Sequence, residues 1–397
     1  MRAVRCLVLV AVMLSWGACT TDVDLAANHA TPSTTLARAD APPVTARVDP
    51  ASTSKPICAA AGERASVVNV PRSIDSTGTV DVTAPLTAWL QSLPPDTEAR
   101  LKPGGTYRAE QPIVLTDRQS LTINGNRALL LRTLKGDPAD PTTRTNAQLR
   151  LTRGADLVIR DLRIQGAHEG REDVPQYQVD YEAQHGVDVH GTQGVTLCTL
   201  DVRKVLGDFV YVGYSDPVVL QAGVAASNVH VFDNLFNFSG RQGVAAVAVH
   251  GLVVERNTLI DVGRTALVVE PVTAALDSDG IVFDANKIVS TPQFVASLGA
   301  PAVVDGLTIT NNTLQASAMG ISIVGTTGLL VANKRNVMIA NNTSDQPCGC
   351  DRLIWLRGID NASVIGNTAP LGGRGLASAL VVFDVDGLVV LDNTWLP

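Results

Sequence analysis

The sequence predicts an all-β protein, a single-stranded right-handed parallel β-helix of about ten coils with a short N-terminal capping helix. Three observations predict this fold: a recurring Asn-centred strand motif, a hydrophobic fraction of small branched side chains, and an amphipathic segment before the repeats. Aromatic residues make up only 4% of the chain, and Val, Leu, Ile and Ala supply most of the 45% hydrophobic fraction. Such side chains suit the narrow interior of a stack of short strands.

The repeat consists of a short apolar strand that ends in Asn, followed by a turn and the next strand. It recurs every 23 to 30 residues, at Asn234, Asn257, Asn286, Asn312, Asn342, Asn367 and Asn393, and upstream the column continues through Asn126, Leu162 and Leu200. One coil cannot bury its own inward face, but coils stacked about 4.8 Å apart form continuous parallel sheets. We expect the Asn amides to hydrogen-bond from coil to coil, and the same Asn to adopt left-handed dihedrals.

The segment before the repeats predicts a helix over the open N-terminal end of the core. Asp81 and Thr83 precede Pro85, a residue that suits a first helical turn. The apolar residues that follow fall on one helical face, and they are Leu86, Trp89, Leu90 and Leu93.

The first residues indicate export. Arg2 and Arg5 precede an apolar run that is too short to span a bilayer and ends near Cys19. Residues 1–19 are therefore a signal peptide, either an ordinary secretory signal or a bacterial lipoprotein signal that leaves a lipid on Cys19. Residues 20–60 lack periodic hydrophobicity and predict a disordered tether, and residues 61–397 form the β-helix domain. We expect an extracellular protein or a cell-surface lipoprotein attached to the membrane through Cys19.

Charge and cysteine content narrow the function classes. The net charge is −7 without a basic stripe, which argues against a nucleic-acid partner. Export leaves Cys58, Cys198, Cys348 and Cys350 for disulfides, with three pairings open. No second Cys pair or nearby His completes a metal site around Cys348 and Cys350, so the sequence predicts neither a metal nor a cofactor.

The chain resembles the pectate lyase-like superfamily of right-handed parallel β-helix proteins over residues 66–397. The resemblance is carried by residues 74–89, by the Pro-Gly-Gly-Thr-Tyr-Arg turn at 103–108, and by the Asn column. It implies a polysaccharide partner and leaves the activity open, because members include lyases, glycosidases, epimerases and non-catalytic fibres. The Asn-Thr-Asp, Asp-Asp, Gly-His-Gly and Arg-Ile-Lys motifs of polygalacturonases are absent, which argues against a standard pectin hydrolase.

Polar residues concentrate at the alternate positions that are expected to face outward on four consecutive strands, at 184–190, 207–213, 241–247 and 264–270. Alignment places His185, Asp208, Gln242 and Thr265 in one column, Asp188 and Tyr211 in a second, and Arg241 and Arg264 in a third. Adjacent strands lie about 5 Å apart, so Asp208 could orient His185 as a general base. The insertion at 165–183 adds Tyr177 and Tyr181, whose rings could stack on sugars, and a second insertion at 214–226 could wall the same cleft.

These residues suit a polyuronide lyase or C5-epimerase better than a glycoside hydrolase. Such an enzyme needs a cation for the uronate carboxylate, a base and an acid. The predicted catalytic residues are His185, Asp208 and Tyr211. The predicted substrate-binding residues are Asp188, Arg241, Gln242, Arg264, Glu270, Tyr177 and Tyr181. A glycoside hydrolase needs two carboxyls about 5–9.5 Å apart, whereas strand geometry places Asp188 and Asp208 about 11 Å apart.

Each candidate also has a purely structural interpretation. His185 could cap a turn, Asp208 could form one, and Arg241 and Arg264 could neutralise nearby aspartates. A non-catalytic polysaccharide-binding or structural β-helix protein therefore remains an alternative. The two interpretations differ in whether Arg241 and Arg264 face open space or are held in salt bridges.

Overall fold

The computed structural model describes residues 58, 62–140, 146–170, 176–215, 223–271, 276–298, 302–326, 332–349 and 351–397. The predicted signal peptide, its Cys19, and Cys350 lie outside these residues, so export and lipidation stay predictions. In the described part of the chain, no helix is long and apolar enough to cross a membrane.

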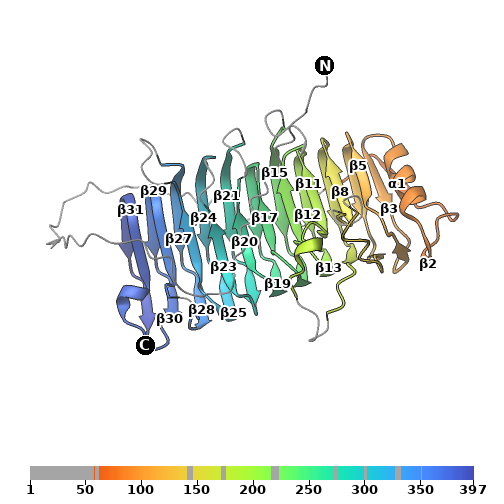
Figure 1. The fold of residues 1–397 in the computed structure, drawn as a ribbon. Coiled ribbons are helices and arrows are strands. Elements are labelled where there is room, and N and C mark those ends of the chain that lie inside the picture. Colours follow the sequence, from red (N-terminus) through yellow and green to blue (C-terminus); the bar gives the residue numbers. More distant parts are fainter. Residues whose placement is uncertain are drawn as a thin grey trace, which may run out of the picture. The chain divides into compact units, whose positions relative to one another are not determined.

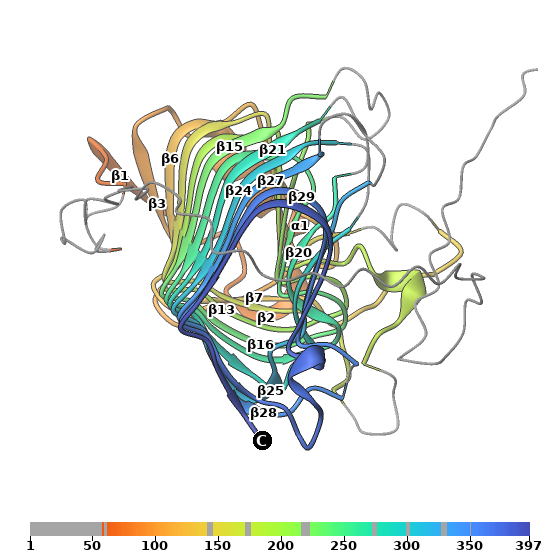
Figure 2. The same cartoon turned by 90° about the vertical axis from the view of Figure 1, so that its left-hand side faces the viewer.

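Three ladders of parallel strands run along the axis of the domain, from the end that carries α1 (Thr83–Ser92) to the end that carries β31 (Leu380–Leu391; Figure 1). The view along the axis shows a three-sided tube (Figure 2). Each ladder forms one side of this tube, and each coil contributes a strand to each ladder. Sheet 1 contains β5 (Ile113–Thr116), β8 (Leu149–Thr152), β11 (Val187–His190), β14 (Val210–Gly213), β17 (Val244–Ala246), β20 (Thr265–Val269), β23 (Gln293–Ser297), β26 (Ile321–Val324) and the first parts of β29 (Ile354–Ile365) and β31 (Leu380–Leu391).

The other two sheets complete each coil. Sheet 2 contains β1 (Ser66–Asn69), β3 (Thr97–Arg100), β6 (Gln119–Asn124), β9 (Ala155–Arg160), β12 (Gln193–Cys198), β15 (Ala226–Phe232), β18 (Val249–Glu255), β21 (Ser278–Asp284), β24 (Val304–Thr310), β27 (Lys334–Ala340) and the second parts of β29 and β31. Sheet 3 contains β2 (Thr77–Asp81), β4 (Thr106–Arg108), β7 (Leu129–Leu131), β10 (Arg163–Gln165), β13 (Asp201–Val205), β16 (Leu235–Ser239), β19 (Thr258–Val262), β22 (Lys287–Val289), β25 (Thr313–Ala318), β28 (Thr343–Gln346), β30 (Thr368–Pro370) and β32 (Thr394–Leu396). In the described part of the chain, the short 3-10 helices η2 (Val179–Tyr181) and η3 (Leu376–Ser378) lie outside the ladders.

The predicted inward residues of sheet 1 are confirmed, although outward residues such as Asp188, Ala245 and Val268 are also buried. Inward side chains from successive coils stack into one continuous apolar core. All eight residues expected to face inward are fully buried: Val187, Val189, Val210, Val212, Val244, Ala246, Leu267 and Val269. The predicted β-helix is therefore correct in fold class and in strand register.

The Asn ladder is confirmed between sheets 2 and 3. The side-chain amide of Asn234 donates to Oδ1 of Asn257 across 2.8 Å, and the same bond repeats in every coil as far as Asn393. The predicted left-handed dihedral is found at Asn126 (φ 47°) but is wrong for the ladder from Asn234 to Asn393. There it belongs to the residue before each ladder Asn, as at Asp233 (φ 54°) and Arg256 (φ 53°). The ladder Asn itself turns inward, where its amide replaces the hydrogen bonds that a tight corner leaves unmade.

The predicted capping helix is present as α1 at the N-terminal end of the core (Figure 1). Leu86, Trp89 and Leu90 on its apolar face are buried against the first coils. Oδ1 of Asp81 accepts hydrogen bonds from the amide and the hydroxyl of Thr83 at the helix start. The helix thus covers apolar side chains that a bare first coil would expose to water.

The N-terminal segment crosses the outside of sheet 2 before the first strand begins. A disulfide joins Cys58 to Cys198 in β12, with 5.9 Å between the Cα atoms. Further along, the hydroxyl of Thr122 in β6 donates to the Gly62 carbonyl across 2.7 Å, and Arg64 pairs with Asp156 in β9 at 2.6 Å. We call the described residues of this segment, 58 and 62–65, the strap. Cys58 falls within the predicted tether, and Cys348 is disulfide-bonded as well.

One cation lies inside the apolar core. Lys334 at the start of β27 is only 1% exposed, between Val304 and Ile359 on the adjacent strands. Its Nζ has no hydrogen-bond partner among the described residues. Burial lowers the pKa of this amine from 10.5 to about 8.

Candidate functional site

The predicted column of His185, Asp208, Gln242 and Thr265 is present, at the corner where the chain enters sheet 1. The backbone amide of Asp208 donates to Nδ1 of His185, and that of Gln242 donates to Oδ1 of Asp208. The amide of Thr265 donates to Oε1 of Gln242, and all three bonds measure 2.9 Å. This corner ladder repeats the amide-to-side-chain bond of the Asn ladder. Much of the polar concentration in the sequence therefore marks a structural corner.

The corner ladder determines what His185 can offer to a substrate. Because Nδ1 accepts the Asp208 amide, the neutral ring carries its hydrogen on Nε2. The carboxylate of Asp208 lies 3.4 Å from the same Nδ1, not on the far side of the ring. The geometry therefore favours His185 as an N–H donor over the general base expected from the sequence. Gln242, expected to bind substrate, has its side-chain oxygen in the ladder and is buried.

Arg241 is held by three carboxylates. Its guanidinium lies 3.0 Å from Asp208, 2.6 Å from Glu270 and 3.6 Å from Glu182. Burial by itself would lower the pKa of this guanidinium, but the charges of Asp208, Glu270 and Glu182 outweigh burial and raise it. Asp208 is completely buried, so it anchors Arg241 and has no surface for a substrate.

Arg264 shares the column of Arg241, as predicted, but its surroundings differ. Its backbone amide donates to the Arg241 carbonyl across 2.8 Å. The guanidinium lies over the ring of Tyr177, 4.9 Å from the ring centroid. Among the described residues it forms no ion pair.

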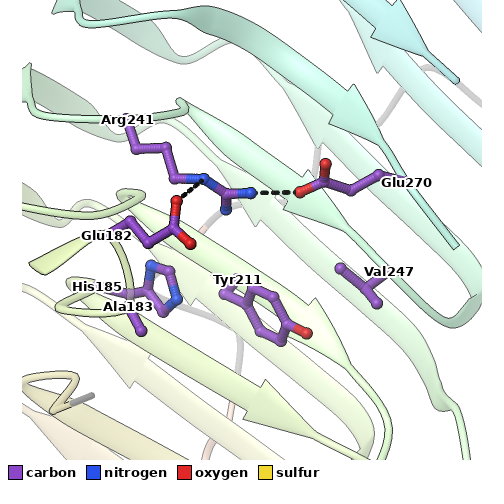
Figure 3. Close-up of a pocket in the computed structure, with 7 residues that line it drawn as sticks. All are labelled: Glu182, Ala183, His185, Tyr211, Arg241, Val247 and Glu270. Atoms are coloured by element: carbon purple, nitrogen blue, oxygen red, sulfur yellow. Dashed lines mark hydrogen bonds and ion pairs between the residues drawn. The ribbon is translucent and has the colours of Figure 1, made fainter. Parts of the chain in front are cut away.

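A cavity of about 230 Å³ opens beside this column, and Figure 3 shows how its walls are arranged. Glu182 and Glu270 approach the guanidinium of Arg241 from different sides, while His185 and Tyr211 form the wall below (Figure 3). The cavity is lined by Glu182, Ala183, His185, Tyr211, Arg241, Val247 and Glu270. Glu182, Ala183 and Val247 were not among the predicted site residues. The only sequence signal for Glu182 was its place at the end of the 165–183 insertion, three residues before His185.

The ring of Tyr211 lies between the imidazole rings of His185 and His190. Its ring centroid lies 5.1 Å from that of His185, nearly parallel to it, and 5.4 Å from that of His190. Burial raises the pKa of this phenol strongly, and the negative charges of Asp188, Glu270 and Asp208 add to the increase. The hydroxyl therefore keeps its proton and can act as a hydrogen-bond donor at the cavity wall.

Asp188 pairs with Tyr211 in register, as predicted, but lies beneath the cavity surface. Its side chain is buried, and Oδ2 accepts from Arg150 at 2.9 Å and lies 3.3 Å from Nε2 of His190. Burial alone would raise the pKa of this carboxyl, but His185, His190 and Arg150 outweigh it and lower the pKa to about 2. Asp188 thus supports the wall and does not line the cavity.

The two tyrosines of the insertion do not form an open stacking platform. The Tyr177 hydroxyl donates to Oε2 of Glu182 across 2.8 Å, and Arg264 covers its ring. Tyr181 reaches the Gly136 carbonyl at 3.5 Å and does not line the cavity. Within the described part of the chain, no three His, Cys, Asp or Glu side chains are arranged to hold a metal ion.

Comparison with known proteins identifies the fold. No protein-family profile and no curated protein matches this sequence. Among solved structures, an endo-xylogalacturonan hydrolase from Aspergillus tubingensis superposes with a TM-score of 0.60 at 14% identity, over 83% of this chain and 92% of that one. The chain shares the parallel β-helix fold of these solved structures. An exopolygalacturonase from Thermotoga maritima superposes with a TM-score of 0.53 at 12% identity, over 83% and 91% of the two chains.

A surface adhesin also has a similar β-helix fold. The surface protein and adhesin PfbA from Streptococcus pneumoniae superposes with a TM-score of 0.51 at 10% identity, over 83% of this chain and 97% of that one. Identities this low establish a shared parallel β-helix fold and no shared residue roles. The function of this chain must therefore be argued from its own cavity.

Proposed function

We propose that this β-helix protein hydrolyses a glycosidic bond in a polysaccharide that carries little negative charge, with Glu182 and Glu270 as its two catalytic carboxyls. The observation that carries the proposal is their approach to one guanidinium from different sides (Figure 3). Oε2 of Glu182 lies 3.6 Å and Oε1 of Glu270 2.6 Å from two nitrogens of one guanidinium. The two carboxylate oxygens therefore lie no more than roughly 8.5 Å apart, below the upper limit of about 9.5 Å for the carboxyl pair of a glycoside hydrolase. One carboxyl protonates the leaving oxygen, and the other activates water or attacks the sugar.

The remaining cavity walls suit an uncharged sugar. The Nε2–H of His185 and the hydroxyl of Tyr211 supply donors for sugar oxygens, and Val247 supplies an apolar contact. The volume of about 230 Å³ lies below the range of roughly 300–1,000 Å³ typical of drug-sized ligands. The cavity therefore suits one ring of a sugar chain.

The local charge disfavours the polyuronide lyase or epimerase suggested by the sequence. Arg241, the cation expected to neutralise the uronate, is already paired with three carboxylates. A uronate carboxylate entering beside Glu182 and Glu270 would be repelled. His185 also presents an N–H to the cavity instead of the free nitrogen that a base requires.

Non-catalytic polysaccharide binding is the second candidate. One observation favours it: Arg241, Glu182 and Glu270 have partners within the protein before any sugar arrives. Binding at a cell surface would agree with the predicted export and the predicted lipid on Cys19.

The test uses the mature protein, residues 20–397, with a panel of neutral glycans and polyuronides. We expect new reducing ends from a neutral glycan, without the ultraviolet absorbance of an unsaturated lyase product. Glu182→Gln and Glu270→Gln should each lower the rate by about 10²-fold or more. The matched control is Glu255→Gln, on the outer face of sheet 2, which should not change the rate.

Two results would contradict the proposal. An unsaturated product from a polyuronide would establish the lyase. Saturable glycan binding by calorimetry without any product would establish the binding protein.

A further inference from the structure

Glu182 is held in place by a residue of its own loop. The hydroxyl of Tyr177 donates to Oε2 of Glu182 across 2.8 Å. The same carboxylate lies 3.6 Å from Nε of Arg241, which is too long for a hydrogen bond. That Nε–H has no hydrogen-bond partner among the described residues. The hydrogen bond from Tyr177 thus holds Glu182 away from Arg241, with which it could otherwise form a closer ion pair.

The loop that carries Tyr177 is fixed to the body of the β-helix. The side-chain amide of Gln176 donates to the carbonyls of Ser239 and Asp261, at 3.1 Å and 2.7 Å, on two successive coils. The backbone carbonyl of Gln176 lies 2.8 Å from Nε2 of His168. The backbone next to Tyr177 is therefore held in place by the hydrogen bonds of Gln176.

The ring of Tyr177 is fixed by a second contact. The guanidinium of Arg264 lies 4.9 Å from the ring centroid, which is a cation–π distance. Burial raises the pKa of the Tyr177 phenol, and the hydrogen bond and charge of Glu182 raise it further, against the opposing charges of Arg264 and Arg241. One face of the Tyr177 ring is therefore covered by Arg264 and is closed to a sugar.

We propose that Tyr177 is a positioning residue for Glu182, and that Arg264 holds the Tyr177 ring in place. The inference rests on the proposed function insofar as it takes Glu182 as one of the two catalytic carboxyls. Removal of the hydroxyl lets the Glu182 carboxylate turn onto the unsatisfied Nε–H of Arg241. Glu182 then faces the guanidinium and no longer faces a bound sugar.

The first test needs no activity. Tyrosinate formation is followed by ultraviolet absorbance against pH in the wild type, Tyr177→Phe, Glu182→Gln and the double variant. We expect Glu182→Gln to shift the titration of one phenol to lower pH, because a charge that stabilises the protonated form is lost. In the Tyr177→Phe background the shift should vanish. A Glu182→Gln protein that titrates like the wild type would overturn the inference.

The second test is kinetic and includes a control in the same loop. Tyr177→Phe keeps the ring and its contact with Arg264, so we expect kcat to fall on the order of 10- to 100-fold with little change in KM, since a misplacement of about 1 Å can cost ~10²-fold. Val179→Ala changes an exposed side chain two residues away and should leave both constants unchanged. An inactive Glu182→Gln with a fully active Tyr177→Phe would overturn the positioning role and keep the proposed function. Full activity in both Glu182→Gln and Glu270→Gln would overturn the proposed function, and the phenol titration would still report on the pair.

Discussion

The backbone amide of Asp208 donates a hydrogen bond to Nδ1 of His185 across 2.9 Å. This bond makes His185 the first rung of the corner ladder, and it orients Nε2 as a donor. Alignment of the repeats within the chain placed the two residues correctly on neighbouring strands. It could not show whether His185 contacts the backbone amide or the carboxylate of Asp208. That choice turns a suspected general base into a hydrogen-bond donor.

Replacement of Arg241 should destabilise the protein strongly. Arg241→Met leaves the carboxylate of Asp208 fully buried without its cation, and loss of one partner of a buried pair costs about 3–5 kcal/mol. Urea unfolding measures the change. Arg264→Gln should cost only about 1 kcal/mol, because it removes one cation–π contact. If both variants lowered the free energy of unfolding equally, the buried Arg241–Asp208 pair would not be the cause of the destabilisation.

The middle of the Asn ladder should be more sensitive than its end. Asn257→Ala removes the acceptor for the Asn234 amide and the donor to the Val231 carbonyl, both buried. Unsatisfied buried groups of this kind should lower the free energy of unfolding by about 2–4 kcal/mol. Asn393 is the last rung and partly exposed, so Asn393→Ala should cost clearly less in the same urea experiment.

Lys334→Met should stabilise the protein, with a defined pH dependence. The folded pKa of about 8 lies below the ordinary 10.5, so the unfolded chain binds the proton more tightly and the penalty is fully present below pH 8. The gain should be about 3 kcal/mol there, at 1.36 kcal/mol per pKa unit, and should vanish as the pH rises through 10.5. Exposed Lys287→Met is the control in chemical unfolding at each pH. A gain that does not vary with pH would point to packing alone.

Loss of the strap disulfide should lower stability through the unfolded state. Cys58 and Cys198 are separated by 140 residues, and a loop of this size predicts a loss of about 5 kcal/mol in the double Ser variant. Calorimetry without reductant measures the loss while the bond at Cys348 stays intact. A wild-type melting temperature in the double variant would show that the strap holds without its covalent bond.

Periodicity was sufficient to predict the fold and the register. Alternation along 187–189 and 210–212 identified the buried Val residues, and the spacing of Asn residues predicted the ladder. Contacts between segments far apart in sequence were not predictable. The position of Glu182 depends on the anchoring of Gln176 to carbonyls 63 and 85 residues away, and the pairing of Cys58 depends on the path of the strap. The left-handed residue was misplaced by one position because Asn suits both the bend and the ladder.

The strap also determines how mechanical force would enter the domain. A pull on the N-terminal chain reaches the β-helix at Cys198 in β12, through a covalent bond, and does not reach β1 first. The first coils therefore carry none of the load, and the force spreads into strands whose neighbours lie on both sides. A protein held by its N-terminus in flowing liquid would resist being unwound coil by coil from its capped end.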